Sequence, residues 1–128
     1  MNVLFDTNVL LWWLGEPSRI KSALLAELRA PESVLFYSQV SLLEIQIKAS
    51  LGKLRLGFSV ERIPDLADQS GLTALPLSNA AIFMLPKLPD VHRDPFDRLL
   101  IAEAIQQGVP LVTPDETIRR YPVKILWG

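Results

Sequence analysis

The sequence contains no cysteine and a single histidine, His92. Without cysteine, disulfide bonds, thiolate metal ligands and a cysteine nucleophile are excluded. The 13 basic and 14 acidic residues nearly balance, for a formal net charge of −1. That balance argues against a strongly basic nucleic-acid-binding protein.

Long apolar runs are also missing, so no segment is expected to span a bilayer. The N-terminal run at residues 9–14 is strongly apolar, but Asp6 precedes it and neither a basic leader nor a small-residue cleavage site accompanies it. A secretory signal peptide would have both of these features. We therefore expect a cytoplasmic protein without a membrane segment.

The length and hydrophobic content of the chain are enough for a substantial core. The 128 residues are 49% hydrophobic, which argues against disorder and predicts one domain over residues 1–128. Apolar, strand-like runs alternate with helix-like stretches that begin near residues 9, 20, 38, 59, 78 and 95. The expected strands are residues 2–5, 34–37, 72–77, 111–113 and 123–126. This alternation predicts an α/β fold with a central parallel sheet of four to five strands flanked by helices.

Residues 92–102 (HRDPFDRLLIA) contain two carboxylates three residues apart at the predicted start of a helix. Asp94 suits the N-cap and Pro95 the first helical position, while Asp97 falls where a carboxylate meets free N–H groups. Both acids can therefore be read as helix caps. The helix that follows is apolar on nearly every side, which indicates that it is buried. Gly108 is expected to end it.

Two further acids follow predicted strands: Asp6 comes after residues 2–5, and Asp115 after residues 111–113. A fourth, Glu44, lies beside an apolar stripe in the helix-like stretch 38–52, where Leu43, Ile47 and Leu51 recur four residues apart. Lys48 offers Glu44 an ordinary i,i+4 salt bridge as the alternative.

The carboxyl ends of parallel strands meet at one sheet edge. Clustered carboxylates repel one another unless a cation neutralises them. Oxygen ligands without cysteine suit Mg²⁺ or Mn²⁺.

Four segments resemble the PIN-domain family, especially the VapC-type ribonuclease toxins of type II toxin–antitoxin pairs. They are residues 4–10 (LFDTNVL), 41–45 (SLLEI), 92–102 and 111–115 (LVTPD). The resemblance runs over the whole chain and leaves no room for a second domain. It implies a PIN-like fold and a metal-dependent endoribonuclease that hydrolyses RNA phosphodiester bonds.

Carried over residue by residue, the resemblance makes Asp6, Glu44, Asp97 and Asp115 the acidic core that holds Mg²⁺ or Mn²⁺. Weaker candidates, which would orient carboxylates or metal-bound water, are Asp94, Thr7, Asn8 and Thr113; for Asp94 the capping role is favoured. The implied partners are an RNA substrate, a small cognate antitoxin protein and a second copy of the chain.

With four acids on metal, the remaining surface would carry −1 + 4 = +3, which favours weak attraction of phosphate. Candidate phosphate contacts are Lys48, Arg93, Arg98 and Arg119, and a solvated surface position is an equal alternative for each. We expect His92 to be a hydrogen-bonding loop residue or a phosphate contact rather than a metal ligand.

Three other kinds of protein share part of this pattern. Residues 5–8 (FDTN) superficially resemble the nucleophile motif Asp-x-Asp-x-Thr of aspartyl-phosphate enzymes, but Asn8 stands where the second acid is needed. Receiver domains begin with paired acids that this sequence lacks. A PIN-like RNA-processing protein, or a non-catalytic binding module outside a toxin–antitoxin system, is the main alternative.

Overall fold

The computed structural model describes all 128 residues. Its centre is a five-stranded parallel sheet with the strand order β3-β2-β1-β4-β5. The strands are β1 (Asn2–Phe5), β2 (Val34–Ser38), β3 (Leu72–Leu75), β4 (Leu111–Val112) and β5 (Ile125–Leu126). The predicted fold class, a parallel sheet flanked by helices, is confirmed.

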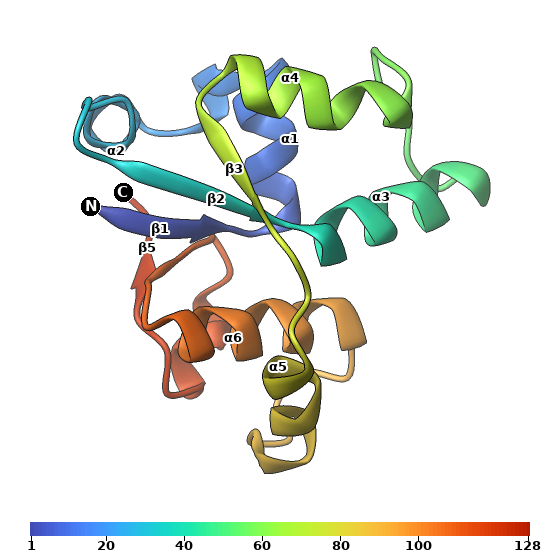
Figure 1. The fold of residues 1–128 in the computed structure, drawn as a ribbon, viewed down its shortest axis with the longest axis vertical. Coiled ribbons are helices and arrows are strands. Elements are labelled where there is room, and N and C mark those ends of the chain that lie inside the picture. Colours follow the sequence, from blue (N-terminus) through green and yellow to red (C-terminus); the bar gives the residue numbers. More distant parts are fainter.

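Six α-helices connect and cover the strands (Figure 1). They are α1 (Thr7–Gly15), α2 (Ser22–Leu28), α3 (Gln39–Ser50), α4 (Ile63–Gln69), α5 (Asn79–Met84) and α6 (Pro95–Gln107). Short 3₁₀ turns lie at Pro17–Arg19, Val60–Arg62, Leu85–Lys87 and Glu116–Arg120. In Figure 1, α1 and α4 lie on one side of the sheet, and α5 and α6 on the other. No helix is both long enough and apolar enough to cross a membrane.

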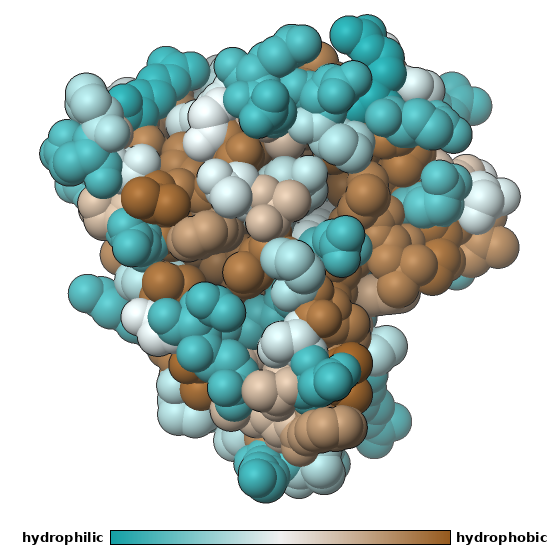
Figure 2. Space-filling model, viewed as in Figure 1, coloured by the Kyte–Doolittle hydropathy of each residue, from teal (hydrophilic) through white to brown (hydrophobic).

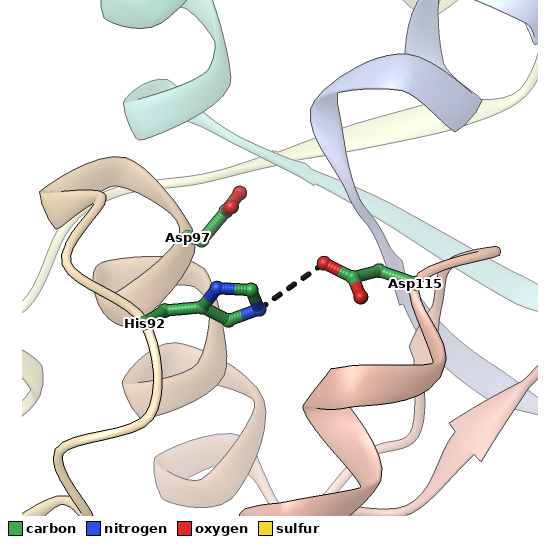
Figure 3. A group of neighbouring side chains, drawn as sticks. All are labelled: His92, Asp97 and Asp115. Atoms are coloured by element: carbon green, nitrogen blue, oxygen red, sulfur yellow. Dashed lines mark ion pairs between the residues drawn. The ribbon is translucent and has the colours of Figure 1, made fainter.

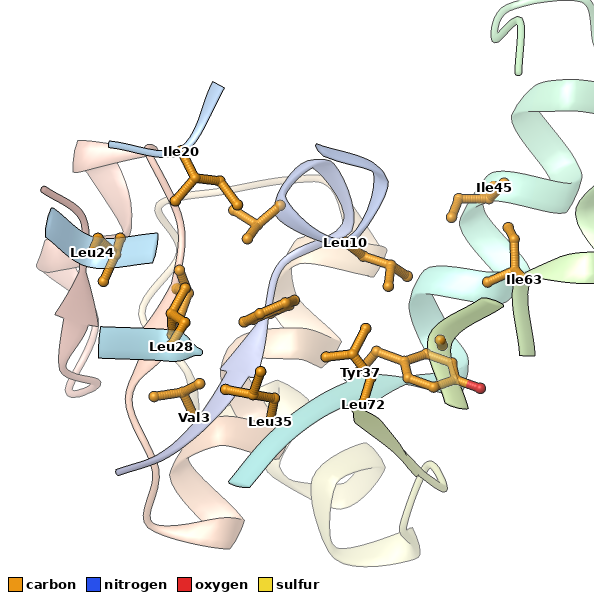
Figure 4. Close-up of a cluster of buried hydrophobic side chains, with 14 residues drawn as sticks. Val3, Leu10, Ile20, Leu24, Leu28, Leu35, Tyr37, Ile45, Ile63 and Leu72 are labelled. Carbon is orange, nitrogen blue, oxygen red and sulfur yellow. The ribbon is translucent and has the colours of Figure 1, made fainter. Parts of the chain in front are cut away.

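The strand β1 supplies side chains to both faces of the sheet, as the period of two in a strand requires. Val3 and Phe5 join a core built with the helices on the α1 side (Figure 4), whereas Leu4 joins a second core with α5 and α6. All three side chains are fully buried. Each buried side chain of this size stabilises the fold by about 1.5–3 kcal/mol. The central position of β1 follows from this two-sided burial.

Several helix starts differ from those predicted. The first helix begins at Thr7, two residues before the predicted start, and is capped by Asp6. The third is capped by Ser38, whose hydroxyl accepts from the backbone N–H of Val40 at 2.9 Å. Ser78 caps α5, near the predicted start of that helix. The predicted cap Asp94 is confirmed, and Gly108 ends α6 in the left-handed conformation with φ of 66°.

The apolar stripe predicted for α3 is not a buried stripe. Leu43, Ile47 and Leu51 are exposed, Leu51 by 63%, while Glu44 and Ile45 are buried. The helix continues beyond the end of β2 (Figure 1), and apolar surface gathers over it in Figure 2. Its buried face is the one that turns toward α1.

Candidate metal centre

Asp6 leaves β1 at the carboxyl edge of the sheet, beside β4. Register pairs Phe5 with Val112, so Asp6 and Thr113 follow neighbouring strand ends. One carboxylate oxygen of Asp6, Oδ1, accepts from the backbone N–H of Val9 at 2.8 Å and caps α1. The other, Oδ2, accepts from the buried Thr113 hydroxyl at 2.5 Å. Asp6 is thus a helix cap and also has an oxygen held at the sheet edge.

Glu44 lies on α3 and is 4% exposed. Its Oε1 accepts from the Thr7 hydroxyl at 2.6 Å, and the Thr7 Oγ1 lies 2.9 Å from the Ser41 Oγ. Its Oε2 pairs with the ammonium of Lys48, so the predicted i,i+4 salt bridge is present. Ser41 is buried in the first turn of α3, where it contacts Thr7.

Asp97 occupies the first turn of α6, as predicted. Burial, followed by the neighbouring carboxylates of Asp94 and Glu44, raises the pKa of Asp97 to about 6. Asp94 precedes it as the N-cap, and its Oδ1 accepts from the backbone N–H of Phe96 at 2.8 Å and of Asp97 at 3.4 Å. The capping role favoured for Asp94 is therefore the one that its hydrogen bonds support.

Asp115 follows β4 and is partly exposed. Its Oδ1 accepts from the backbone N–H of Thr117 at 3.0 Å and from its hydroxyl at 2.7 Å, so Asp115 caps the 3₁₀ turn. Its Oδ2 lies 3.1 Å from Nε2 of His92. The backbone N–H of Asp115 donates to the Thr113 hydroxyl at 3.1 Å, so Thr113 contacts both Asp6 and Asp115.

The four acids share one electrostatic environment. The pKa of Asp6 is raised to about 6, chiefly by burial; the hydrogen bonds from Thr113 and Val9 oppose this rise, and the charges of Glu44 and Asp115 add to it. The charges of Glu44 and Asp6 likewise raise the pKa of Asp97. Carboxylates this crowded favour binding of a cation, and their oxygen donors fit a hard divalent ion.

A nitrogen donor also reaches this group. One ligand atom from each of His92, Asp97 and Asp115 lies within 4.8 Å of the other two, and Figure 3 shows the ring below Asp97 and beside Asp115. The sequence predicted His92 to be a hydrogen-bonding loop residue or a phosphate contact rather than a ligand, and in the structure it does hydrogen-bond with Tyr121 and Thr117. Its partners Thr117 and Tyr121 were not predicted at all.

Other candidates lie elsewhere or have different contacts. Asn8 is exposed and lines a neighbouring groove with Arg19 and Arg55, without a hydrogen bond to the acids. The guanidinium of Arg98 donates to the backbone carbonyls of Leu85, Pro89 and His92, which fastens the loop before α6. Arg98 therefore has a structural role, and it was not predicted.

A five-stranded parallel sheet with a cluster of buried and half-buried acids at its carboxyl edge defines a class of α/β proteins with a candidate divalent-metal centre. The PIN domain family model matches residues 3–124, and the chain belongs to that family. The resemblance predicted from four segments is confirmed.

The chain is also similar to individual proteins of known sequence or structure. The chain is 29% identical over 123 residues to Ribonuclease VapC22 of Mycobacterium tuberculosis, with 93% of this chain and 91% of that protein covered. Its fold is similar to a chain of VapBC2 from Rickettsia felis bound to promoter DNA, with a TM-score of 0.74, 20% identity and full coverage of both chains. A chain of VapBC-5 from M. tuberculosis matches with a TM-score of 0.63 and 19% identity, covering 99% of this chain and 98% of that chain.

Proposed function

We propose that residues 1–128 form one PIN domain that acts as a Mg²⁺- or Mn²⁺-dependent endoribonuclease, the toxin of a toxin–antitoxin pair in the cytoplasm. The observation that carries the proposal is the gathering of four acids, Asp6, Glu44, Asp97 and Asp115: the charges of Glu44 and Asp115 act on Asp6, and those of Glu44 and Asp6 act on Asp97. These residues come from the ends of β1 and β4 and from the helices α3 and α6. The similarity to a VapC ribonuclease supports the same function.

In this proposal the four carboxylates hold the ion or ions. When bound, such an ion lowers the pKa of a water molecule and stabilises negative charge that develops on the phosphate. Thr113 holds Asp6, and Thr7 holds Glu44, so two carboxylates are oriented before metal arrives. We assign Lys48 and Arg93 to contacts with the RNA backbone. Lys48 pairs with Glu44, and Arg93 lies four residues before Asp97 in the sequence.

The proposed partners of the chain are a small antitoxin and a second copy of the chain. Support comes from the solved structures that share the fold, several of which are VapBC complexes. The exposed side chains of Leu43, Ile47 and Leu51 on α3 offer apolar surface that a protein partner would remove from water.

The test is cleavage of RNA by the purified chain with Mg²⁺ or Mn²⁺, beside Asp6→Asn and Asp97→Asn. We expect cleavage by the wild type, loss of cleavage with a chelator, and a reduction of at least about a hundredfold in either variant, because each removes a charge that holds the ion. Circular dichroism checks that the variants are folded. Equal cleavage by all three proteins would contradict the assignment, and metal binding without cleavage by any of them would favour a non-catalytic binding module.

A further inference from the structure

His92 has the only imidazole of the chain, and its ring lies beside two carboxylates of the candidate metal centre (Figure 3). One ligand atom from each of His92, Asp97 and Asp115 lies within 4.8 Å of the others. Ligands on opposite sides of a small divalent ion are about 4.2 Å apart, given bonds of about 2.1 Å. His92 and Asp97 therefore need only a small adjustment to bind one ion, while Asp115 lies on the Nε2 side of the ring.

The ring is held in place from two directions. The backbone N–H of His92 donates to the Tyr121 hydroxyl at 2.7 Å, and the two rings stack at 6.2 Å with an interplanar angle of 11°. Nε2 lies 2.7 Å from the Thr117 Oγ1 and 3.1 Å from Oδ2 of Asp115. An imidazole fixed in this way loses little further freedom when it binds a ligand.

Both polar contacts of the ring involve Nε2. When Nε2 carries the proton and donates to Asp115 and Thr117, the lone pair is on Nδ1, which Figure 3 draws on the ring edge nearer Asp97. Histidines that bind metals commonly donate one ring N–H to a carboxylate while the other nitrogen binds the ion. The contacts of His92 have this arrangement.

We propose that His92 is a nitrogen ligand of the metal centre, which binds the ion through Nδ1 beside Asp97. This inference rests on the proposed function, because it requires an ion at the acidic cluster. Mg²⁺ takes oxygen ligands and keeps several waters, whereas transition-metal ions also accept imidazole nitrogen. The site is therefore expected to prefer Mn²⁺ to Mg²⁺.

The test uses the whole chain loaded with Mn²⁺ and read by pulsed electron paramagnetic resonance, which detects coupling between the manganese spin and a ligand nitrogen. Because the chain has a single histidine, an imidazole ¹⁴N coupling belongs to His92 without any substitution. We expect this coupling in the wild type, and its replacement by a ¹⁵N coupling in protein labelled with ¹⁵N-histidine. The labelled wild type decides the question even if a His92 variant does not fold.

A variant supplies a second measurement. His92→Phe keeps an aromatic ring to stack on Tyr121 and removes both nitrogens. We expect it to lose the imidazole coupling, to bind Mn²⁺ at least about tenfold more weakly by calorimetry, and to lose less affinity for Mg²⁺. The matched control, Lys87→Gln, changes an exposed residue on the same connection and should bind Mn²⁺ as the wild type does.

The outcomes separate this inference from the proposed function. Mn²⁺ binding without imidazole coupling in the wild type overturns the His92 ligand and leaves the acidic metal centre standing. Absence of Mn²⁺ binding altogether overturns both. Equal loss of Mn²⁺ and Mg²⁺ affinity in His92→Phe, with no coupling in the wild type, would make His92 a residue that only positions Asp115.

Discussion

Glu103, on α6, is the most buried acidic side chain of the protein, at 2% exposure. Neither of its carboxylate oxygens has a well-aligned hydrogen-bond partner. Burial raises its pKa to about 7, and the neighbouring Ser38 hydroxyl offsets part of that shift. An ionised carboxylate in this place would be buried without compensation, which proteins rarely tolerate.

This environment predicts a pH-dependent stability. The unfolded chain binds the Glu103 proton with a pKa near 4.5, the folded chain with a pKa of about 7. The folded state therefore holds more protons between these values, and stability falls as pH rises through that window. We expect Glu103→Gln to raise the free energy of unfolding by up to about 3 kcal/mol at pH 8 and to change it little at pH 4.

Urea unfolding of both proteins from pH 4 to pH 8 measures this difference. Comparing the variant with the wild type at each pH cancels the titration of Asp6 and Asp97, which runs in the same direction because both pKa values are raised to about 6. A stability difference that is the same at every pH would show that Glu103 is not titrating.

At the scale of single residues, local patterns located three of the acids, because Asp6 and Asp115 follow strands and Asp97 lies in the first turn of a helix. Glu44, in the interior of α3, was singled out by its apolar neighbours and by the family resemblance. It did not find the contacts that orient them. Thr7 and Ser41 meet across 34 positions, and Thr117 and His92 across 25. Only the packing of separate elements brings such pairs together, so local patterns cannot reveal them.

Among the elements, α6 has the most complete set of end signals. Asp94 accepts from two backbone N–H groups at its start, Pro95 follows, and Gly108 closes it in a left-handed conformation. All three were predicted, because caps depend on residue types at fixed offsets.

The cap and the charge of Asp94 can be separated by substitution. Asp94→Ala removes the acceptor and should lower the free energy of unfolding by about 1 kcal/mol. Asp94→Asn keeps an acceptor and should cost little, while it removes a charge that raises the pKa of Asp97. Urea denaturation at pH 7 compares the three proteins. If Asp94→Asn lost Mn²⁺ affinity as strongly as Asp97→Asn, Asp94 would be a ligand rather than a cap.

The element predicted least well was α3. Leucines four residues apart indicate a common face, but they do not say whether that face meets the core. Here the face with Glu44 turns inward, because Thr7 and Lys48 satisfy both oxygens of the carboxylate. Glu44 is therefore buried on the inner face of α3, where the hydrophobic pattern alone would predict a leucine.

For the whole molecule, alternation of strands and helices was enough to predict a parallel sheet. The strand order was not predicted, because it depends on which buried faces pack together and not on any local signal. β1 lies at the centre since its side chains are buried on both faces.

A metal that binds only the folded chain should stabilise the whole molecule. At a concentration of one hundred times its Kd, such an ion contributes about 2.7 kcal/mol. We expect Mn²⁺ to raise the Tm of the wild type by several degrees in a thermal scan, and to leave the Tm of Asp6→Asn nearly unchanged. A Tm rise of equal size in both proteins would place the ion elsewhere on the surface.

The pairing of β1 with β4 joins the beginning of the chain to a segment near its end. During translation, Asp6 leaves the ribosome long before Thr113 and Asp115 have been synthesised. The sheet edge on which these residues meet cannot form until β4 has also emerged, since parallel pairing of distant segments must wait for both. Nascent chains in which β4 has not yet emerged therefore lack the complete acidic cluster, and a cell that makes this protein meets its proposed activity only after that strand has been synthesised.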